Sequence, residues 1–262
     1  MLLSFAFIST TTAQRNEMGV FVGASNYNGE LNPAPLNLKF LHPAFGIMYR
    51  FNKSKHVSYK LNAYYGWVSG EDFRSADSFQ IKRNLSFFSH VLDVSGVMEF
   101  NFFPYVPGTQ EIYFTPYVFA GFSFFHFNPT ANYGKYNYEL WNMHTEGEAT
   151  YSKISTAFPF GGGFKLSLTQ IINIGFELGV RKTYTDYLDD VSGTYPDPKI
   201  FSDPVAAGLS NKSTILSSET LKGRQRGNPN DNDWYMFTGF WITFNMFKIG
   251  KHSCDAFPPF RF

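Results

Sequence analysis

Eight aromatic-rich segments of alternating polarity recur along this chain, and the connections between them are long and short in turn. Most segments have roughly 9–13 residues, about the length that a tilted strand needs to cross the apolar core of a membrane. Every second connection is short, as in bacterial outer-membrane barrels, which have tight periplasmic turns and longer outer loops. We therefore predict an all-β fold, an eight-stranded antiparallel transmembrane β-barrel with short periplasmic turns and long extracellular loops. The predicted strands are Glu17–Tyr27, Pro43–Phe51, Val57–Gly70, His90–Phe102, Ile112–Phe127, Phe158–Leu168, Ile171–Tyr187 and Trp234–Met246.

The alternation within each segment distinguishes a membrane barrel from a soluble one, because successive side chains of a strand face opposite sides. In Ile171–Tyr187, one column, Ile172–Val180, is apolar and the other, Asn173–Arg181, is polar or glycine. Gly, Ser and Asn are frequent in the polar column and fit the crowded interior of an eight-stranded barrel. A soluble barrel would instead bury its apolar column and expose charge. We predict that the apolar column faces lipid, with aromatic residues toward the strand ends.

Eight ionisable residues fall in the predicted inner column, four of each sign. Charges enclosed by lipid-facing walls are tolerated only when they are paired or hydrated. We therefore expect a lumen closed by ion pairs and hydrogen bonds, which argues against a general pore. The predicted lumen charge network consists of Glu17, Arg50, Lys60, Asp93, Glu99, Lys165, Glu177 and Arg181.

The composition agrees with a barrel and gives no support to two other classes of protein. Aromatic residues make up 19% of the chain, yet the mean hydropathy is only −0.21, because apolar and polar residues alternate. A net charge of +1 gives no reason to expect nucleic acid as a partner. The best candidate for a membrane helix, Ile112–Phe127, is too short and contains Pro116 and Gly121. Because Pro116 and Pro159 each remove a ladder donor, both are expected near strand ends or bulges.

The two ends of the chain point to export. Residues 1–14, an apolar stretch followed by small residues, are typical of a cleaved signal peptide, although no Lys or Arg precedes the stretch. Residues 15–246 are assigned to the barrel, and an even number of crossings places the tail, residues 247–262, on the periplasmic side. Cys254 in this tail is the only cysteine, and an odd thiol in an exported protein suggests an intermolecular disulfide. A reduced or capped thiol is the alternative.

No residue pattern indicates catalysis, a metal site or a cofactor, so we predict that the protein is not an enzyme. The six histidines are scattered singly, with no short ligand spacing and no set of cysteine partners. No nucleophile elbow is present. The acidic run Asp186–Asp190, followed by Asp197 and Asp203, offers carboxylates for calcium, but its spacing does not match a calcium loop. We interpret it as a solvated surface run, and Arg224–Pro229 as a polar loop.

Motifs of one known family recur in order along nearly the whole mature chain. They are Asn16–Phe21, Ser25–Pro33, Arg83–Phe87, Glu99–Tyr105, Phe114–Gly121, Pro159–Lys165, Arg181–Ser192 and Gln225–Pro229, of which the last three are the most specific. Through these motifs the chain resembles the PorG-like outer-membrane β-barrel component of the type IX secretion machinery of Bacteroidota. The resemblance implies a non-catalytic barrel in the Gram-negative outer membrane that anchors or assembles a periplasmic ring. The implied partners are outer-membrane lipid, a periplasmic ring lipoprotein and the associated ring subunit.

Two functional hypotheses follow. In the first, the turns Asn52–His56 and Phe103–Glu111, together with the Cys254 tail, form the surface on which the periplasmic ring docks. In the second, the protein is a stand-alone surface or ligand-binding barrel that acts through its extracellular loops, Asn128–Ala157 and Leu188–Asp233.

Overall fold

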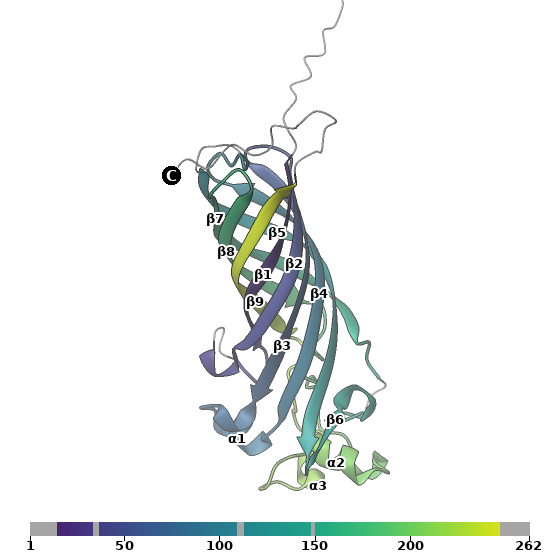
Figure 1. Ribbon diagram of the computed structural model, residues 1–262. Helices are drawn as coiled ribbons and strands as arrows, with labels where there is room; N and C mark the ends of the chain where they lie inside the picture. Colours follow the sequence, from purple (N-terminus) through teal and green to yellow (C-terminus); the bar gives the residue numbers. More distant parts are fainter. Residues whose placement is uncertain (1–14, 34–36, 109–112, 148–149, 247–262) are drawn as a thin grey trace, which may run out of the picture.

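Eight strands form a closed antiparallel barrel in the computed structural model, which describes residues 15–33, 37–108, 113–147 and 150–246 (Figure 1). Strands that follow one another around the wall are paired, and the first strand also pairs with the last, from Asn16 with Met246 to Asn28 with Trp234. Closure leaves no open edge in the described wall, so its backbone groups are satisfied without water. The barrel strands are β1 (Arg15–Asn28), β2 (His42–Asn52), β3 (Val57–Glu71), β4 (Ser86–Asn101), β5 (Tyr113–Tyr133), β7 (Ile154–Ser167), β8 (Ile172–Thr183) and β9 (Trp234–Met246).

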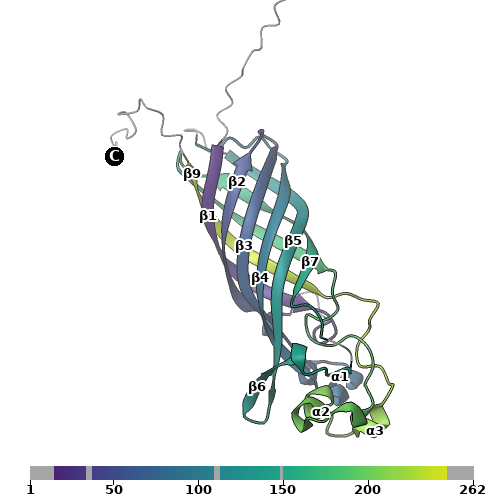
Figure 2. The ribbon, with the colours of Figure 1, turned by 90° about the vertical axis from the view of Figure 1, so that its right-hand side faces the viewer.

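The two ends of the barrel differ in the length of their connections. The described turn residues 53–56, 102–108 and 168–171 lie where β1 begins and β9 finishes, at the top of Figure 1, and we call this the turn end. The opposite end, the loop end, carries the longer connections and the short strand β6 (Tyr136–Glu139), which projects beyond the barrel in Figure 2. The predicted alternation of long and short connections is therefore confirmed. The helical elements, all at the loop end, are η1 (Leu38–Phe40), η2 (Asp72–Arg74), α1 (Ser78–Arg83), η3 (Leu140–Asn142), η4 (Pro198–Ile200), α2 (Pro204–Ser210) and α3 (Ser218–Leu221).

All eight predicted strands are present, and the differences lie at their ends. The bounds of β9 are those predicted. β5 continues to Tyr133 instead of ending at Phe127, because its last residues pair with β6 in a hairpin. β8 ends at Thr183 and not at Tyr187, because the chain turns there into the folded connection to β9.

The pleat separates an apolar outer face from an inner face that carries the charged residues. In the middle of β4, Val94 is 54% exposed, whereas its neighbours Asp93 and Ser95 are buried. This confirms that the apolar column faces outward. An exposed apolar surface that surrounds a barrel wall requires lipid around it. The outward side chains include Val20, Val22, Ile47, Leu61, Val94, Met98, Phe124, Leu178 and Phe240.

None of the described helices is long and apolar enough to span a membrane.

The two strand prolines differ in position. Pro116 lies near the beginning of β5, as predicted. Pro159 lies well inside β7, where the ladder to β5 is interrupted between the pairs Ala120–Phe160 and Ser123–Ala157. The register is the same on both sides of this interruption, so it is not a bulge, and the prediction for Pro159 was wrong. Pro159 has no backbone N–H to donate to a neighbouring strand. The pairing of β7 with β8 nevertheless continues past it.

The outward position of Val94 predicts how the barrel responds to charge. We expect Val94→Arg to destabilise the barrel folded in lipid vesicles by about 2–4 kcal/mol, because it places a cation near mid-membrane. Leu168→Arg, at the turn end, should cost about 0–1 kcal/mol. Urea titrations followed by tryptophan fluorescence measure both values. Equal losses for the two variants would contradict the assignment of the lipid-facing wall.

Candidate functional site

Six strands each contribute one charged side chain to the turn-end half of the lumen. These side chains project inward because they occupy the inner column of their strands. The antiparallel register places Glu17 of β1 opposite Arg50 of β2, which brings opposite charges together. It also places two cations, Arg50 and Lys60 of β3, opposite each other, so these cations need carboxylates from other strands. The six residues are Glu17, Arg50, Lys60, Glu99, Lys165 and Glu177.

Glu99 lies at the centre of this network. Its Oε2 atom lies 2.9 Å from Arg50 Nε and 2.5 Å from Lys165 Nζ. Its Oε1 atom lies 3.2 Å from Lys60 Nζ. One carboxylate therefore contacts three cations from three different strands.

The network continues on both sides of this centre. Arg50 Nη1 lies 2.9 Å from Glu17 Oε2, and Lys60 also pairs with Glu177. The hydroxyl of Tyr117 donates a hydrogen bond to Glu177 Oε2 at 2.6 Å. Three carboxylates and three cations are thus balanced within one connected set, which is the condition for burying charges in a low-dielectric interior.

Asp93 and Arg181 form a separate pair nearer the loop end. Arg181 Nε lies 3.9 Å from Asp93 Oδ2, a longer contact than those around Glu99. Tyr235 donates its hydroxyl hydrogen to Asp93 Oδ2 at 2.7 Å. Of the eight residues in the predicted lumen network, the structure thus joins six in one set and leaves two as a looser pair.

The charged layer of the lumen is dry. All eight ionisable side chains lie in residues that are at most 1% exposed, whereas a water-filled channel would leave their surfaces accessible. Tyr105, in the turn after β4, is also buried, and its ring centroid lies 5.0 Å from Lys165 Nζ. This turn therefore inserts a ring into the lumen from the turn end and helps to close the described barrel to water.

Aromatic rings fill the loop-end half of the lumen, which the sequence analysis did not predict. Phe21 stacks on Tyr64 with ring centroids 4.6 Å apart, and Phe237 meets Tyr64 edge to face at 5.4 Å. Phe125 lies 5.1 Å from Tyr235. These rings occupy inner positions of their strands, so the inner column already contained the signal, but it was interpreted as polar only.

Two buried arginines join the loops into one packed unit, which we call the loop cap (residues 29–33, 72–85, 140–147 and 184–233). Arg83 forms two hydrogen bonds of 2.8 Å with the Asp72 carboxylate. It also donates to the Arg226 carbonyl oxygen at 2.5 Å. Arg226 in turn lies 2.8 Å from Glu146 Oε1 and donates to the Asp190 carbonyl oxygen at 2.5 Å.

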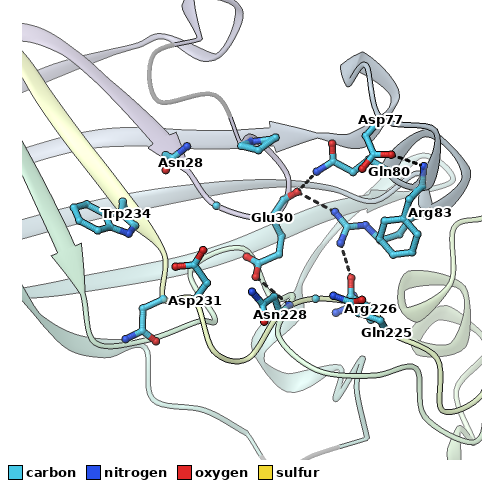
Figure 3. Close-up of a pocket in the computed structure, with 15 residues that line it drawn as sticks. Asn28, Glu30, Asp77, Gln80, Arg83, Gln225, Arg226, Asn228, Asp231 and Trp234 are labelled. Carbon is cyan, nitrogen blue, oxygen red and sulfur yellow. Dashed lines mark hydrogen bonds between the residues drawn. The ribbon is translucent and has the colours of Figure 1, made fainter.

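A cavity of about 290 Å³ lies in the loop cap beside Arg83 and Arg226 (Figure 3). Glu30 reaches across it: its carbonyl oxygen accepts a hydrogen bond from Arg83 at 3.1 Å, and its Oε1 atom accepts one from the Asn228 backbone N–H at 3.2 Å. Trp234, at the start of β9, also lines the cavity. The wall combines both signs of charge with an aromatic side chain, a composition suited to a polar ligand.

The interpretation of Asp186–Asp190 as a solvated surface run was wrong. Its three aspartates are all buried. Leu188 and Val191 belong to the core cluster that includes the lumen aromatics. Their packing buries the neighbouring aspartates as well. Arg226, in the expected polar loop Arg224–Pro229, is buried as well. The sequence carried no local signal for this burial, because it depends on contacts with strands far away in the chain.

Buried carboxyl groups of the loop cap disfavour one another's ionisation. Burial, followed by the Asp186 carboxylate, raises the pKa of Glu30 to about 7. Burial raises the pKa of Asp186 to about 7, and the Asp189 carboxylate adds to the rise. Burial, followed by Asp189 and Glu30, also raises the pKa of Asp233. The cap therefore gathers carboxyl groups whose ionised forms are disfavoured by burial and by one another.

Some sequence-based predictions lie outside the described residues. These are the signal peptide (1–14), the periplasmic tail (247–262) and its Cys254.

A closed barrel with an apolar outer wall and a dry, ion-paired lumen defines a small transmembrane β-barrel whose described part has no open channel. The chain belongs to the family described as "Domain of unknown function (DUF6089)", whose model matches residues 1–203. No curated protein sequence matches the chain.

Several solved barrels are similar to this chain at low identity. The N-terminal β-barrel domain of OprF from Pseudomonas aeruginosa has 14% identity and a TM-score of 0.39, with 89% of this chain and 98% of that chain covered. The attachment invasion locus protein Ail of Yersinia pestis has 8% identity and a TM-score of 0.43 over 89% and 99% of the two chains. Neisserial surface protein A has 10% identity and a TM-score of 0.43 over 87% and 96%. Similarities at this level carry no argument about function.

The central position of Glu99 predicts a large effect of removing its charge. Glu99→Gln should lower the free energy of unfolding by about 3–5 kcal/mol, because buried cations lose their shared partner. Glu219→Gln, at an exposed position on α3, should change it by less than about 0.5 kcal/mol. Denaturant titrations in detergent measure both.

Charge balance gives a sharper version of this experiment. If unbalanced charge causes the loss, Glu99→Gln combined with Lys165→Met should recover part of it, because one uncompensated cation is removed together with the carboxylate. A double variant that is less stable than Glu99→Gln alone would argue against charge balance as the cause.

Proposed function

We propose that this protein is a non-catalytic outer-membrane barrel of the type IX secretion machinery, which anchors or assembles the periplasmic ring complex. The observation that carries the proposal is the dry lumen centred on Glu99. An eight-stranded barrel whose interior is filled by paired side chains offers no conduit for a protein, so its function must lie in its surfaces. The proposed location is the outer membrane of a Gram-negative member of the Bacteroidota, the group in which the resembling family occurs.

The motifs that carry this resemblance supply the residues that build the interior. Asn16–Phe21 contains Glu17, Glu99–Tyr105 begins with the central glutamate, and Pro159–Lys165 ends with its lysine partner. Glu99 contacts Lys165 directly and is joined to Glu17 through Arg50, so the motifs are explained as parts of one lumen network. This supports the proposal of a related barrel with a plugged interior.

The turn end offers a continuous surface for a periplasmic partner. Lys53 and Lys55 are exposed in the turn between β2 and β3. The Tyr105 backbone N–H donates to the Lys55 carbonyl oxygen at 2.9 Å, which ties this turn to the next one. Phe102 and Phe103 in that next turn are half exposed. Exposed aromatic rings beside charged groups are typical of protein interfaces, and we propose this surface as the docking site for the ring lipoprotein and its associated subunit.

A paired set of variants tests the docking surface. Lys53→Glu combined with Lys55→Glu should reduce the recovery of ring subunits with the tagged barrel, in mild detergent, by tenfold or more, because it reverses the charge of the turn. Lys135→Glu makes a similar change in the exposed turn before β6, at the loop end, and should leave recovery unchanged. Heat-dependent gel mobility confirms that each barrel is folded. Ring recovery that is unaffected by the turn variant would rule out this surface.

Cys254 supplies a covalent version of the same experiment. If the tail docks on a ring subunit through a disulfide, non-reducing gels of whole cells should show a band of higher mass that disappears in Cys254→Ser and in the presence of reductant. The attached protein can be identified from the excised band. If the wild type and Cys254→Ser give the same bands, Cys254 forms no covalent tether to a ring subunit.

The loop cap favours a second candidate function, that of a surface or ligand-binding barrel acting outside the cell. The supporting observation is the cavity of about 290 Å³ beside Arg83, Arg226 and Glu30. Substitutions in the cap and at the turn end separate the two functions. A secretion defect caused only by turn-end variants favours ring assembly, whereas a phenotype caused only by cap variants favours surface binding.

A further inference from the structure

Three carboxylates from distant parts of the chain meet at the loop end. Glu30 follows β1, Asp189 lies in the connection after β8, and Asp233 directly precedes β9. One oxygen atom from each lies within 4.8 Å of the others. Calcium binds oxygen ligands at 2.3–2.6 Å, so two ligands on opposite sides of the ion are roughly 4.6–5.2 Å apart. The spacing of the three oxygens therefore fits a calcium ion between them.

Asp186 provides a second observation that does not depend on this spacing. The residue is 6% exposed, and neither carboxylate oxygen has a hydrogen-bond partner among the described residues. Asp186 lies three residues before Asp189 in the same connection after β8. Glu30 Oε2 is likewise buried without a partner. Buried carboxylates that lack donors are unfavourable unless a proton or a cation compensates them.

Among the described residues, the buried arginines of the loop cap form no ion pair with these carboxylates, and Arg83 lowers the pKa of Glu30 and of Asp189 only in part. Arg83 forms its bidentate contact with Asp72, and Arg226 pairs with Glu146 and Asp190. These contacts leave Glu30, Asp189 and Asp233, whose oxygens lie close together, and the buried Asp186 without an ion pair among the described residues.

The hydrogen bonds within the cluster orient the carboxylates without neutralising them. The Leu188 N–H donates to Asp233 Oδ2 at 3.0 Å, and the Val191 N–H donates to Asp189 Oδ1 at 2.9 Å. The Tyr27 hydroxyl lies 2.6 Å from Asp189 Oδ2 and 2.9 Å from Asp233 Oδ1. A phenol carries one hydrogen, so Tyr27 cannot donate fully to both carboxylates, and one of them lacks that donor.

We propose that Glu30, Asp186, Asp189 and Asp233 form a calcium site that fastens the loop cap to the rim of the barrel. Glu30 lines the cavity of Figure 3, which gives the ion a route from solvent. Oxygen-only ligands and a high count of carboxylates suit calcium. Extracellular calcium modules bind with Kd values of about 10⁻⁴–10⁻³ M, and we expect an affinity in this range or tighter. The site does not depend on ring docking at the other end of the barrel.

The experiment uses the full chain, refolded in detergent and freed of metal with a chelator. Calorimetric titration with CaCl₂ should show saturable binding of about one ion. At a calcium concentration of about 100 Kd, the midpoint of thermal unfolding should rise by roughly 5–10 °C. Terbium, used as a calcium probe, should gain luminescence through Tyr27 and lose it when calcium is added.

Matched variants connect the binding to these residues. Asp186→Asn, and Asp189→Asn combined with Asp233→Asn, should each weaken calcium binding by tenfold or more. Because these changes also remove repulsion, the metal-free variants should remain folded, as heat-dependent gel mobility can show. Glu219→Gln on α3 should bind calcium like the wild type.

Two results would overturn the proposal. One is wild-type protein whose calorimetric signal and unfolding midpoint do not respond to 10 mM calcium, which would leave shared protons as the compensating charge. The other is calcium binding that is equal in the wild type and in both sets of aspartate variants, which would place the ion elsewhere on the protein.

Discussion

The narrow interior of an eight-stranded barrel is the constraint on which the rest of this structure depends. Such a barrel is only wide enough for side chains to fill its lumen, and the pleat sends every second residue of each strand inward. Charged residues there cannot reach water, so they must neutralise one another. Glu99, in contact with Arg50, Lys60 and Lys165, meets this requirement across the turn-end half of the lumen. The same packing leaves the two ends of the wall as the surfaces to which the proposed functions are assigned.

The two ends handle charge differently. In the lumen, carboxylates and cations are balanced in one connected set. In the loop cap, Arg83 and Arg226 neutralise their own partners, while Glu30 and Asp233 remain among like charges. The balanced charges of the lumen stabilise the barrel interior, whereas the unpaired carboxylates of the loop cap are suited to bind a cation. The proposed calcium site and the proposed ring-docking surface therefore belong to opposite ends and can be tested separately.

Local periodicity was enough to predict the barrel but not its ends or its cap. Alternation alone was enough to place Glu177 in the inner column, because side chains along a strand alternate between its two faces. The position of Pro159 inside β7 could not be predicted in this way, because it depends on where the β5–β7 ladder is interrupted, and alternation does not show that. Asp186–Asp190 was assigned to solvent because acidic runs are usually hydrated, and no nearby residue indicated that Leu188 would enter the core.

The sequence by itself determined the number of strands, the face that each residue presents and the balance of charge inside the wall. These properties follow from local alternation and from the physical need to pair enclosed charges. Only the tertiary structure decided which charges meet, since Glu99 and Lys165 come from non-adjacent strands and their contact depends on barrel closure and register. It also decided that Glu30, Asp189 and Asp233 converge, because three separate connections must fold over the same rim before their carboxylates can share one site.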